Sequence, residues 1–289
     1  MSERLQLAEH FIDSHGRNAA RALEAMPAEV AGGVIDTISD PLSVQALKVM
    51  LPYHAARCVL AMPADSGSKY LAALTVREAA AILRHTGEEA RKNLLDLLPR
   101  QRAVRVALIL GYPQSLVGSW MDPITLSLPI TGTVADARTR IKNEGYSHGT
   151  IFVVDDGNRI RGSISLVRLL LQAREEESLS ALMQTAVEPV RASMTLERAF
   201  DAAGWLENDL LPVTDRDDRF IGVIRYAELR RALAKPSIAD RAAERGDNLM
   251  GITEACYLGL ADLLATTLAD NRDDAAEGNL DDGRTAQDR

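Results

Sequence analysis

The chain is poor in aromatic residues and in cysteine, and it has no excess of positive charge. Aromatic residues make up 4% of the 289 residues, and Ala and Leu are abundant, which favours helices over a β-sandwich. The two cysteines, Cys58 and Cys256, lie far apart, which argues against a disulfide framework or a structural zinc site and indicates a reducing cytoplasm. The 33 Lys and Arg residues against 41 Asp and Glu residues give a net charge of -8, which argues against a nucleic-acid-binding protein.

Long hydrophobic runs are also missing from the sequence. No stretch reaches the roughly 18 consecutive apolar residues that a membrane-spanning helix needs. The best candidate, residues 249–269, contains Glu254 and Asp262, and each carboxylate would cost about 2.5–3.5 kcal/mol at the bilayer centre. The N-terminus has no signal-peptide core. We therefore expect a soluble cytoplasmic chain with no direct membrane span.

An internal repeat is the most informative feature of the chain. Residues 120–171, the first repeat, and residues 182–233, the second repeat, follow the same pattern, and Gly162 and Gly222 lie 60 residues apart. Such a repeat is typical of two copies of one structural unit that together complete a core. Each copy is expected to contain a helix, a strand, a return strand and a closing helix, at 135–144, 150–155, 161–165 and 166–176 in the first and at 196–207, 211–215, 220–224 and 227–234 in the second.

A series of short helices is predicted before the repeat. Breaks such as Pro27, Pro52 and Pro63 recur at short intervals between residues 26 and 113, with apolar residues at helical spacing between them. Helices of about two turns do not persist alone in water, so we expect them to stack into a superhelical array, here called the helical array. No nucleophile with a positioned base is evident, so we do not expect an enzyme.

These segments carry a resemblance to known families. The strand, the Asp-rich turn and the following Gly-x-h-[ST]-x-x-[DE] pattern resemble a pair of CBS domains over residues 120–235. The LPxxAAxxVLxxP run at residues 51–63 resembles the N-terminal superhelical domain of MgtE-type magnesium transporters, and the GYPxSxxGxWM run at residues 111–121 resembles the link between those domains. The resemblance implies a multi-domain α plus α/β fold: an N-terminal all-α superhelical array, a tandem CBS pair and a C-terminal amphipathic helix.

The expected domains are the helical array at 1–118, the first CBS domain at 119–178 and the second CBS domain at 179–236. In the MgtE family a transmembrane bundle follows the CBS pair, whereas only about fifty residues remain here. The chain is therefore similar to the cytosolic region of such a transporter without its pore. Residues 237–289 are expected to form an amphipathic helix and an acidic, disordered tail. The helix would pack either on its own CBS dimer or on a separately encoded membrane transporter.

The resemblance implies a Mg²⁺ site. In the family, Mg²⁺ bridges acidic side chains between the N domain and the CBS pair and at the dimer interface, because a hard cation relieves the repulsion of clustered carboxylates. The candidate metal ligands lie in the two turns that follow buried strands: Asp155, Asp156, Asp215, Asp217 and Asp218. For Asp155, Asp156 and Gly157, however, we favour a plain hairpin turn over a metal site. The residues do not distinguish Mg²⁺ from Mn²⁺ or Ca²⁺.

The resemblance also implies a possible adenine-nucleotide cleft. In nucleotide-binding CBS domains the closing motif supplies a hydroxyl residue and an acidic residue that contacts the ribose. The first repeat has Ser165 but Arg168 at the acidic position, and the second has Arg225 at the hydroxyl position with Glu228 at the acidic one. The arginines would either meet phosphates as bidentate donors or lie on the surface of a module that binds no nucleotide. We favour the absence of a strong adenosine site.

The leading hypothesis is a cytoplasmic, homodimeric regulator that senses Mg²⁺ in magnesium homeostasis or transport and dimerises through its CBS domains. Bound cation would favour one arrangement of the domains over another. One alternative is an adenine-nucleotide sensor. The other is a ligand-independent scaffold for a membrane transporter, since the array also resembles the helical repeats of a flagellar motor-switch protein. The sequence leaves the orientation of the dimer open.

Overall fold

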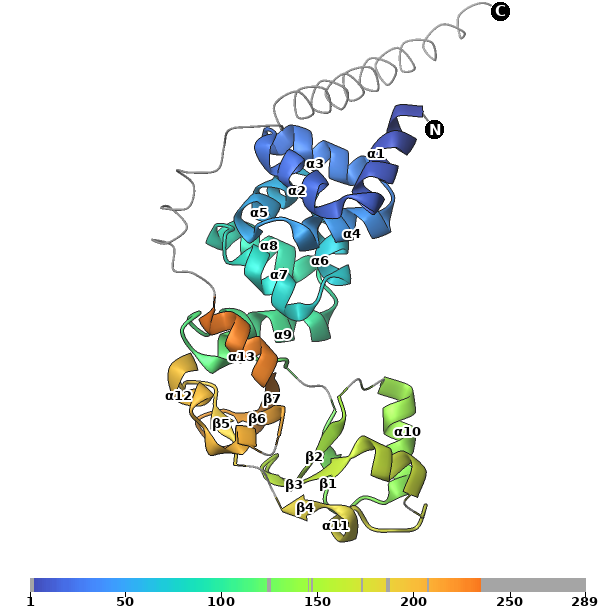
Figure 1. Ribbon diagram of the computed structural model, residues 1–289, viewed down its shortest axis with the longest axis vertical. Coiled ribbons are helices and arrows are strands. Elements are labelled where there is room, and N and C mark those ends of the chain that lie inside the picture. Colours follow the sequence, from blue (N-terminus) through green and yellow to red (C-terminus); the bar gives the residue numbers. More distant parts are fainter. Residues whose placement is uncertain are drawn as a thin grey trace, which may run out of the picture. The chain divides into compact units, whose positions relative to one another are not determined.

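The computed structural model describes residues 3–234, apart from residues 124–125, 145, 147, 173, 186–187 and 207. The described chain forms two compact units, residues 3–103 and residues 104–234, each visible in Figure 1. The predicted C-terminal helix and tail, residues 237–289, lie outside the described residues.

The first unit consists of short helices of eight to twelve residues. Several of them start where the sequence supplies a proline or a capping side chain. Pro52 lies in the first turn of its helix, and Thr75 accepts a hydrogen bond from the Glu78 N–H while the Glu78 carboxylate accepts one from the Thr75 N–H. The helices are α1 (Glu3–Ser14), α2 (Gly16–Ala25), α3 (Ala28–Thr37), α4 (Asp40–Val49), α5 (Pro52–Ala61), α6 (Ala64–Ala73), α7 (Val76–Leu83), α8 (Glu88–Leu97) and α9 (Arg100–Leu110), the last of which crosses into the second unit.

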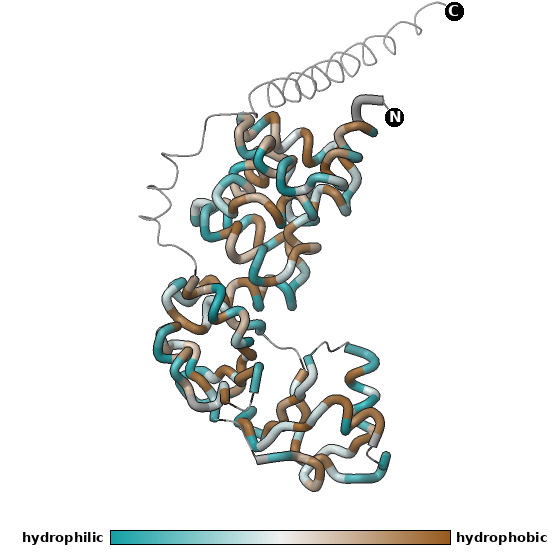
Figure 2. Tube along the Cα trace, viewed as in Figure 1, coloured by the Kyte–Doolittle hydropathy of each residue, from teal (hydrophilic) through white to brown (hydrophobic). Residues whose placement is uncertain are grey.

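Small residues let these helices stack. Helix α3 packs against α5 and α5 against α7, while α2, α4, α6 and α8 form a second stack. A side chain at Gly32 would place its Cβ 3.0 Å from the Cys58 carbonyl oxygen, so α3 and α5 approach closely at that point. Figure 2 shows hydrophobic and hydrophilic residues alternating along the helices of this unit, as expected for elements with one buried face. The predicted helical array is confirmed.

A four-stranded sheet in the order β1-β2-β3-β4 consists of three strands of the first repeat and of β4, which comes from the start of the second repeat. Strand β1 is parallel to β2, and the other neighbours are antiparallel. The elements in chain order are η1 (Val117–Ser119), β1 (Leu128–Pro129), α10 (Val134–Glu144), β2 (Thr150–Val154), β3 (Ile160–Ser165), η2 (Arg168–Gln172), α11 (Leu179–Leu182) and β4 (Gln184–Thr185).

The second repeat forms a three-stranded sheet in the order β5-β6-β7 with the same register as the first. Val153 lies opposite Gly162, and Val213 lies opposite Gly222, with an irregularity one residue later in both pairs. The sequence repeat is therefore a structural repeat. Its elements are β5 (Val190–Arg191), α12 (Leu196–Phe200), η3 (Ala203–Leu206), β6 (Leu210–Thr214), β7 (Phe220–Arg225) and α13 (Tyr226–Leu233).

The opening residues of each repeat pair with the sheet of the other repeat. Gln184 opens the second repeat and lies opposite Ser163 of β3, while Asp122 opens the first repeat and bridges to Val223 of β7. This exchange of opening residues between the two sheets brings their backbone very close to β3 and β7. A Cβ on Gly162 would lie 2.7 Å from the Gln184 carbonyl oxygen, and one on Gly222 would lie 2.7 Å from that of Asp122.

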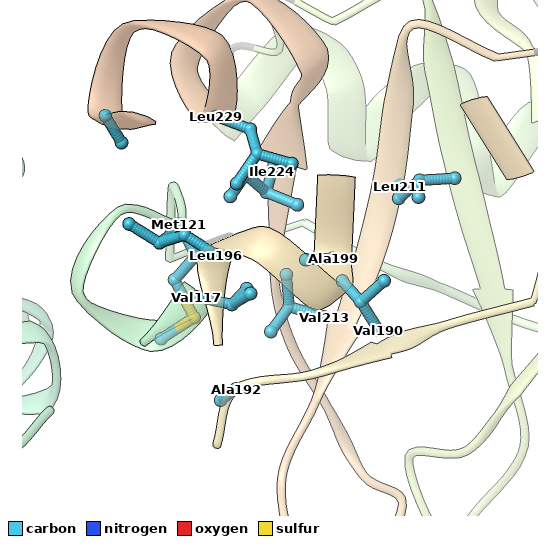
Figure 3. Close-up of a cluster of buried hydrophobic side chains, with 11 residues drawn as sticks. Val117, Met121, Val190, Ala192, Leu196, Ala199, Leu211, Val213, Ile224 and Leu229 are labelled. Atoms are coloured by element: carbon cyan, nitrogen blue, oxygen red, sulfur yellow. The ribbon is translucent and has the colours of Figure 1, made fainter. Parts of the chain in front are cut away.

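The hydrophobic core of the second repeat likewise contains residues from the start of the first repeat. Figure 3 shows Val117 and Met121, which lie next to the start of the first repeat, among side chains of the second repeat such as Ile224 and Leu229. A separate buried cluster joins the two repeats, and in it the rings of Phe152 and Phe220 lie 5.4 Å apart between centroids.

Two predicted helices are shorter in the structure than in the sequence analysis. The helix expected over 166–176 ends at residue 172, because the carbonyls of Glu175 and Glu177 turn back to accept hydrogen bonds from the first N–H groups of α10. The helix expected over 196–207 divides into α12 and η3. Between them the indole of Trp205 donates a hydrogen bond of 2.6 Å to the Ala199 carbonyl.

Candidate ligand site at the junction of the repeats

The acidic turn of the first repeat is built around the Asp155 carboxylate. Its Oδ1 accepts hydrogen bonds of 2.9 Å from the N–H groups of Gly157 and Arg159, and its Oδ2 lies 2.7 Å from the Arg161 guanidinium. These donors, the Arg159 N–H foremost, hold the pKa of the Asp155 carboxyl below its ordinary value. Asn158 completes the turn with a φ of 57°, which Asn tolerates better than most residues. Asp155 is therefore a turn-forming residue.

The second acidic turn repeats this geometry. Asp215 Oδ1 accepts hydrogen bonds of 2.9 Å from the N–H groups of Asp217 and Arg219. Asp218 has a φ of 59° and corresponds to Asn158, and its Oδ1 lies 3.0 Å from the Arg191 guanidinium. Of the five aspartates, Asp155, Asp215 and Asp218 thus have structural partners.

The two turns are joined to each other. The carbonyl of Asn158 accepts a hydrogen bond of 2.8 Å from the Phe220 N–H, and the Asn158 amide donates one of 2.7 Å to the Phe220 carbonyl. The five predicted metal ligands therefore lie on two neighbouring turns. Nearby cations balance them, since five arginines occupy or contact the same turns: Arg159, Arg161, Arg191, Arg216 and Arg219.

The predicted nucleotide-cleft residues occupy equivalent places at the ends of the return strands. Ser165 ends β3 opposite Thr150 and is exposed, and Arg168 begins η2 and is also exposed. In the second repeat, Arg225 ends β7. Glu228 lies in the first turn of α13, where 17% of its side chain is exposed and its Oε1 lies 3.1 Å from the Arg231 guanidinium.

A buried histidine that the sequence analysis did not select connects the repeats. His148 is 7% exposed and lies just before β2. Its Nδ1 lies 2.7 Å from Arg225 Nη2, and its Nε2 lies 3.3 Å from Asp122 Oδ2. Because a guanidinium can only donate, Nδ1 must accept, and the ring proton therefore resides on Nε2, directed at Asp122. The neutral imidazole links a carboxylate before β1 to a guanidinium at the end of β7.

Tyr146 closes one side of this contact. Its ring packs against the His148 ring at 5.2 Å between centroids, and its hydroxyl donates a hydrogen bond of 2.8 Å to the Thr150 carbonyl. Burial, reinforced by the charge of Asp122, raises the pKa of Tyr146 far above its ordinary value. The phenol therefore remains protonated at physiological pH.

Comparison with known families agrees with this architecture. The model of the MgtE intracellular N domain matches residues 14–115, and the CBS domain model matches residues 117–174 and 179–235. The chain joins an MgtE N domain to a CBS domain pair. The helical array is thus the MgtE N domain, and the two repeats are the first and second CBS domains.

Two solved structures share the MgtE-like domain arrangement. One, described as the soluble part of a magnesium transporter, is 18% identical, covers 83% of this chain and 98% of its own, and has a TM-score of 0.57. The other, the cytosolic domain of the Mg²⁺ channel MgtE in complex with ATP, is 19% identical, covers 79% and 99%, and has a TM-score of 0.51. At these identities the likeness shows the fold alone. No curated protein sequence matches the chain.

No helix in the described part of the MgtE-like chain has the length and apolar character needed to cross a membrane. Within the same residues, no three His, Cys, Asp or Glu side chains are grouped so that they could hold a metal ion. A closed cation site built by one copy of the CBS pair is therefore not formed by the described residues. Asp156 and Asp217 are exposed, and their carboxylates take no part in the turn hydrogen bonds. Two exposed carboxylates of this kind fit only a hydrated cation that is held by one or two carboxylates.

The fit of the second CBS domain to a nucleotide is partial. Glu228 retains the acidic position, but one guanidinium nitrogen of Arg225 is hydrogen bonded to His148. For Arg225 to bind a phosphate through both nitrogens, it would have to leave or share this contact. His148 and Asp122 were missed because three segments distant in sequence bring them together, and only the register of the exchanged strands reveals the meeting point.

Proposed function

We propose that this chain is a non-catalytic regulator of magnesium transport whose CBS pair responds to a divalent cation. The observation that carries the proposal is the junction of two acidic turns, through Asn158 and Phe220, in a CBS pair that follows an MgtE N domain. The N domain family is described as intracellular, so we place the protein on the cytoplasmic side. Two structures with this fold are described as parts of magnesium transport proteins, and we extend that association to this chain.

The proposed cation ligands are Asp156 and Asp217, because the other three aspartates are engaged in the turns. Mg²⁺ retains several of its waters in proteins and is commonly held by one or two carboxylates, so two exposed side chains suffice for a weak site. A cation that binds one arrangement of the domains better than another shifts the population towards it. The response requires no chemical step.

We also propose that the protein acts as a homodimer through its CBS domains and regulates a separately encoded membrane transporter. A dimer places two copies of each acidic turn in one assembly, which raises the number of carboxylates available to a shared cation. The partner transporter would supply the pore and this chain the response to its ligand.

The test is a Mg²⁺ titration of the full chain, from zero to about ten millimolar, followed by thermal melting and small-angle scattering. The melting temperature should rise and the molecule should become more compact. The double variant Asp156→Asn/Asp217→Asn should lose this response, whereas Asp96→Asn, an exposed carboxylate at the end of α8, should keep it. If the wild-type protein does not respond to Mg²⁺, the proposal is wrong.

An adenine nucleotide is the second candidate ligand, and the partly buried Glu228 beside Arg225 favours it. Calorimetric titration with ATP and with AMP measures binding directly. Arg225→Ala should weaken nucleotide binding about tenfold or more if the guanidinium meets a phosphate, since charge-assisted hydrogen bonds are worth about 1.5–3 kcal/mol. Arg168→Ala tests the guanidinium that stands at the acidic position of the first CBS domain. The absence of heat with either nucleotide at millimolar concentration would exclude this candidate.

A further inference from the structure

The contact between His148 and Arg225 depends on the protonation state of the histidine. The ring of His148 is buried, and its Nδ1 accepts a hydrogen bond of 2.7 Å from Arg225 Nη2. A protonated imidazole has two N–H donors and no acceptor, so it has nothing to offer a guanidinium. Arg225 can therefore keep this contact only while His148 is neutral.

The charges around the ring determine what protonation would do. Among the described residues, three titratable or charged side chains contact the ring, from three separate segments: Asp122 before β1, Tyr146 before β2 and Arg225 at the end of β7. A proton on Nδ1 would leave Nε2 directed at Asp122, which pairs favourably with a charged ring, but it would place two positive charges in contact at Arg225. Like charges at this distance repel. Arg225 would therefore leave the ring.

Arg225 has access to solvent once it leaves the ring. The residue is exposed as a whole, although its Nη2 reaches the buried His148. Glu228, the nearest carboxylate along the chain, already lies 3.1 Å from the Arg231 guanidinium. A released Arg225 could therefore bind an oxyanion through two parallel N–H groups, the geometry in which a guanidinium binds phosphate most strongly.

The equivalent place in the other repeat shows that the fold does not require this pair. The residue sixty positions after His148 is Asn208, whose amide donates a hydrogen bond of 3.1 Å to the Gly204 carbonyl. The residue sixty positions before Arg225 is Ser165. The titratable ring and the guanidinium thus occur together at one of the two strand ends, while the backbone register is the same at both.

We propose that a proton and an oxyanion bind cooperatively at this junction: the proton on His148 Nδ1 releases Arg225, and the released guanidinium binds a phosphate or sulfate group. Histidine is the side chain that ordinarily changes charge between about pH 5 and pH 8, so mild acidification is the signal. The inference uses the guanidinium of the second candidate ligand but requires neither the Mg²⁺ response nor an adenine base.

The test follows the binding of sulfate to the full chain by NMR, from about pH 8 to about pH 5.5, with chloride holding the ionic strength constant. Sulfate stays doubly charged over this range, so a change in affinity reports a change in the protein. The backbone N–H of Tyr226, next to Arg225, serves as the probe. Sulfate should bind at least about tenfold more tightly at the lower pH, since a hydrogen bond to a charged group has about this effect on an equilibrium constant.

Three variants separate this linkage from a general effect of acid. His148→Asn introduces the residue found at the equivalent place, Asn208, and should bind sulfate with nearly the same affinity at both pH values. His54→Asn removes a histidine of the helical array and should retain the pH dependence of the wild type. Arg225→Gln should lose the saturable shift of the probe. Circular dichroism verifies that each variant is folded.

The linkage must also be reciprocal, because coupling between two binding events acts equally on both. Saturating sulfate should therefore move the midpoint of the His148 ring titration to higher pH. At neutral pH, tighter binding of AMP than of sulfate would identify the anion as a nucleotide phosphate, and equal or weaker binding would identify it as a free oxyanion.

Three results would overturn the inference: no sulfate binding at any pH, a wild-type affinity that does not change with pH, or the same pH dependence in His148→Asn as in the wild type. None of them bears on the cation response, which the Mg²⁺ titration decides separately. The binding of ATP is likewise decided by its own calorimetric titration.

Discussion

Replacing Gly162 with alanine should disturb the exchange of strands between the CBS domains. The new Cβ would lie 2.7 Å from the Gln184 carbonyl oxygen and 3.0 Å from the Met183 sulfur, closer than such atoms normally approach. Strand β4 must therefore move away, which weakens its pairing with β3 at Gly162–Thr185 and Ser163–Gln184. Because the obstacle is a backbone carbonyl, a change of rotamer cannot relieve it.

The expected magnitude follows from two opposing contributions. Overpacking costs about 1–3 kcal/mol, while alanine lowers the entropy of the unfolded chain and returns about 0.4–1 kcal/mol. The net loss for Gly162→Ala is about 1–2 kcal/mol, or roughly 3–8 °C in the melting temperature of a unit of this size. Gly222→Ala should lose a similar amount, since its Cβ would lie 2.7 Å from the Asp122 carbonyl oxygen.

Gly149→Ala is the matched control in the first CBS domain, because no heavy atom lies within 4 Å of its Cβ position. Its stability should be unchanged or slightly raised. Calorimetric melting of the three variants beside the wild type measures the differences. If Gly162→Ala is as stable as Gly149→Ala, the close approach of the exchanged segment is not a constraint, and our account of the 60-residue glycine spacing is refuted.

Three further predictions concern buried or turn-forming polar groups. His148→Phe keeps a ring but removes the link between Asp122 and Arg225, so denaturant unfolding should show a loss of about 1–3 kcal/mol, with His54→Phe on the helical array as a nearly neutral control. Asp155→Ala should destabilise the protein more than Asp156→Ala at neutral pH; because the folded pKa of Asp155 is lowered, the difference should shrink as the pH falls below the ordinary aspartate range and carboxylates become protonated. Burial raises the pKa of the Cys58 thiol from 9.0 to about 11. Above pH 9 the folded state therefore binds more protons than the unfolded state. Stability should then decline between pH 9 and 11 by up to roughly 3 kcal/mol relative to Cys58→Ala, and equal pH profiles for the two proteins would contradict the assignment.

Local signals in the sequence predicted much of this fold. The β-branched runs at 150–155 and 211–215 became β2 and β6 within one residue at each end, because buried strands bounded by turn residues leave few alternatives. The interpretation of Asp155 as a hairpin residue rested on the Gly and Asn that follow it, and the geometry of the turn agrees with it. The domain boundaries at 118, 178 and 236 remain predictions.

Contacts between segments that lie far apart in the chain could not be predicted from the sequence. Met121 and Asp122 were assigned to the first repeat by their position, yet they pack on the second, because pairing depends on strand register rather than on chain order. The repeat identified Gly162 and Gly222, but the backbone carbonyls that they approach could not be predicted. The end of the closing helix at residue 172 was missed for a similar reason, since the carbonyls that end it satisfy α10, which lies more than thirty residues earlier.

The two CBS domains share a backbone but differ at their equivalent polar positions, and this asymmetry bears on ligand binding. His148 corresponds to Asn208, whose amide donates a hydrogen bond to the Gly204 carbonyl in its own domain. Arg225 corresponds to Ser165, which has no guanidinium to offer an anion. A small anionic ligand should therefore prefer one of the two strand ends strongly.

We accordingly expect any nucleotide to bind with a stoichiometry near one per chain, because, of the two described strand ends, the end of β7 is the one that combines a guanidinium with a partly buried carboxylate. Calorimetry gives this number directly, and Arg225→Ala should weaken binding at this site about tenfold or more, while Ser165→Ala should leave it unchanged. Two equivalent sites per chain would mean that the ligand recognises the shared backbone of the CBS domains and not the side chains that distinguish them. In that case the contact between His148 and Arg225 would serve the joining of the domains alone.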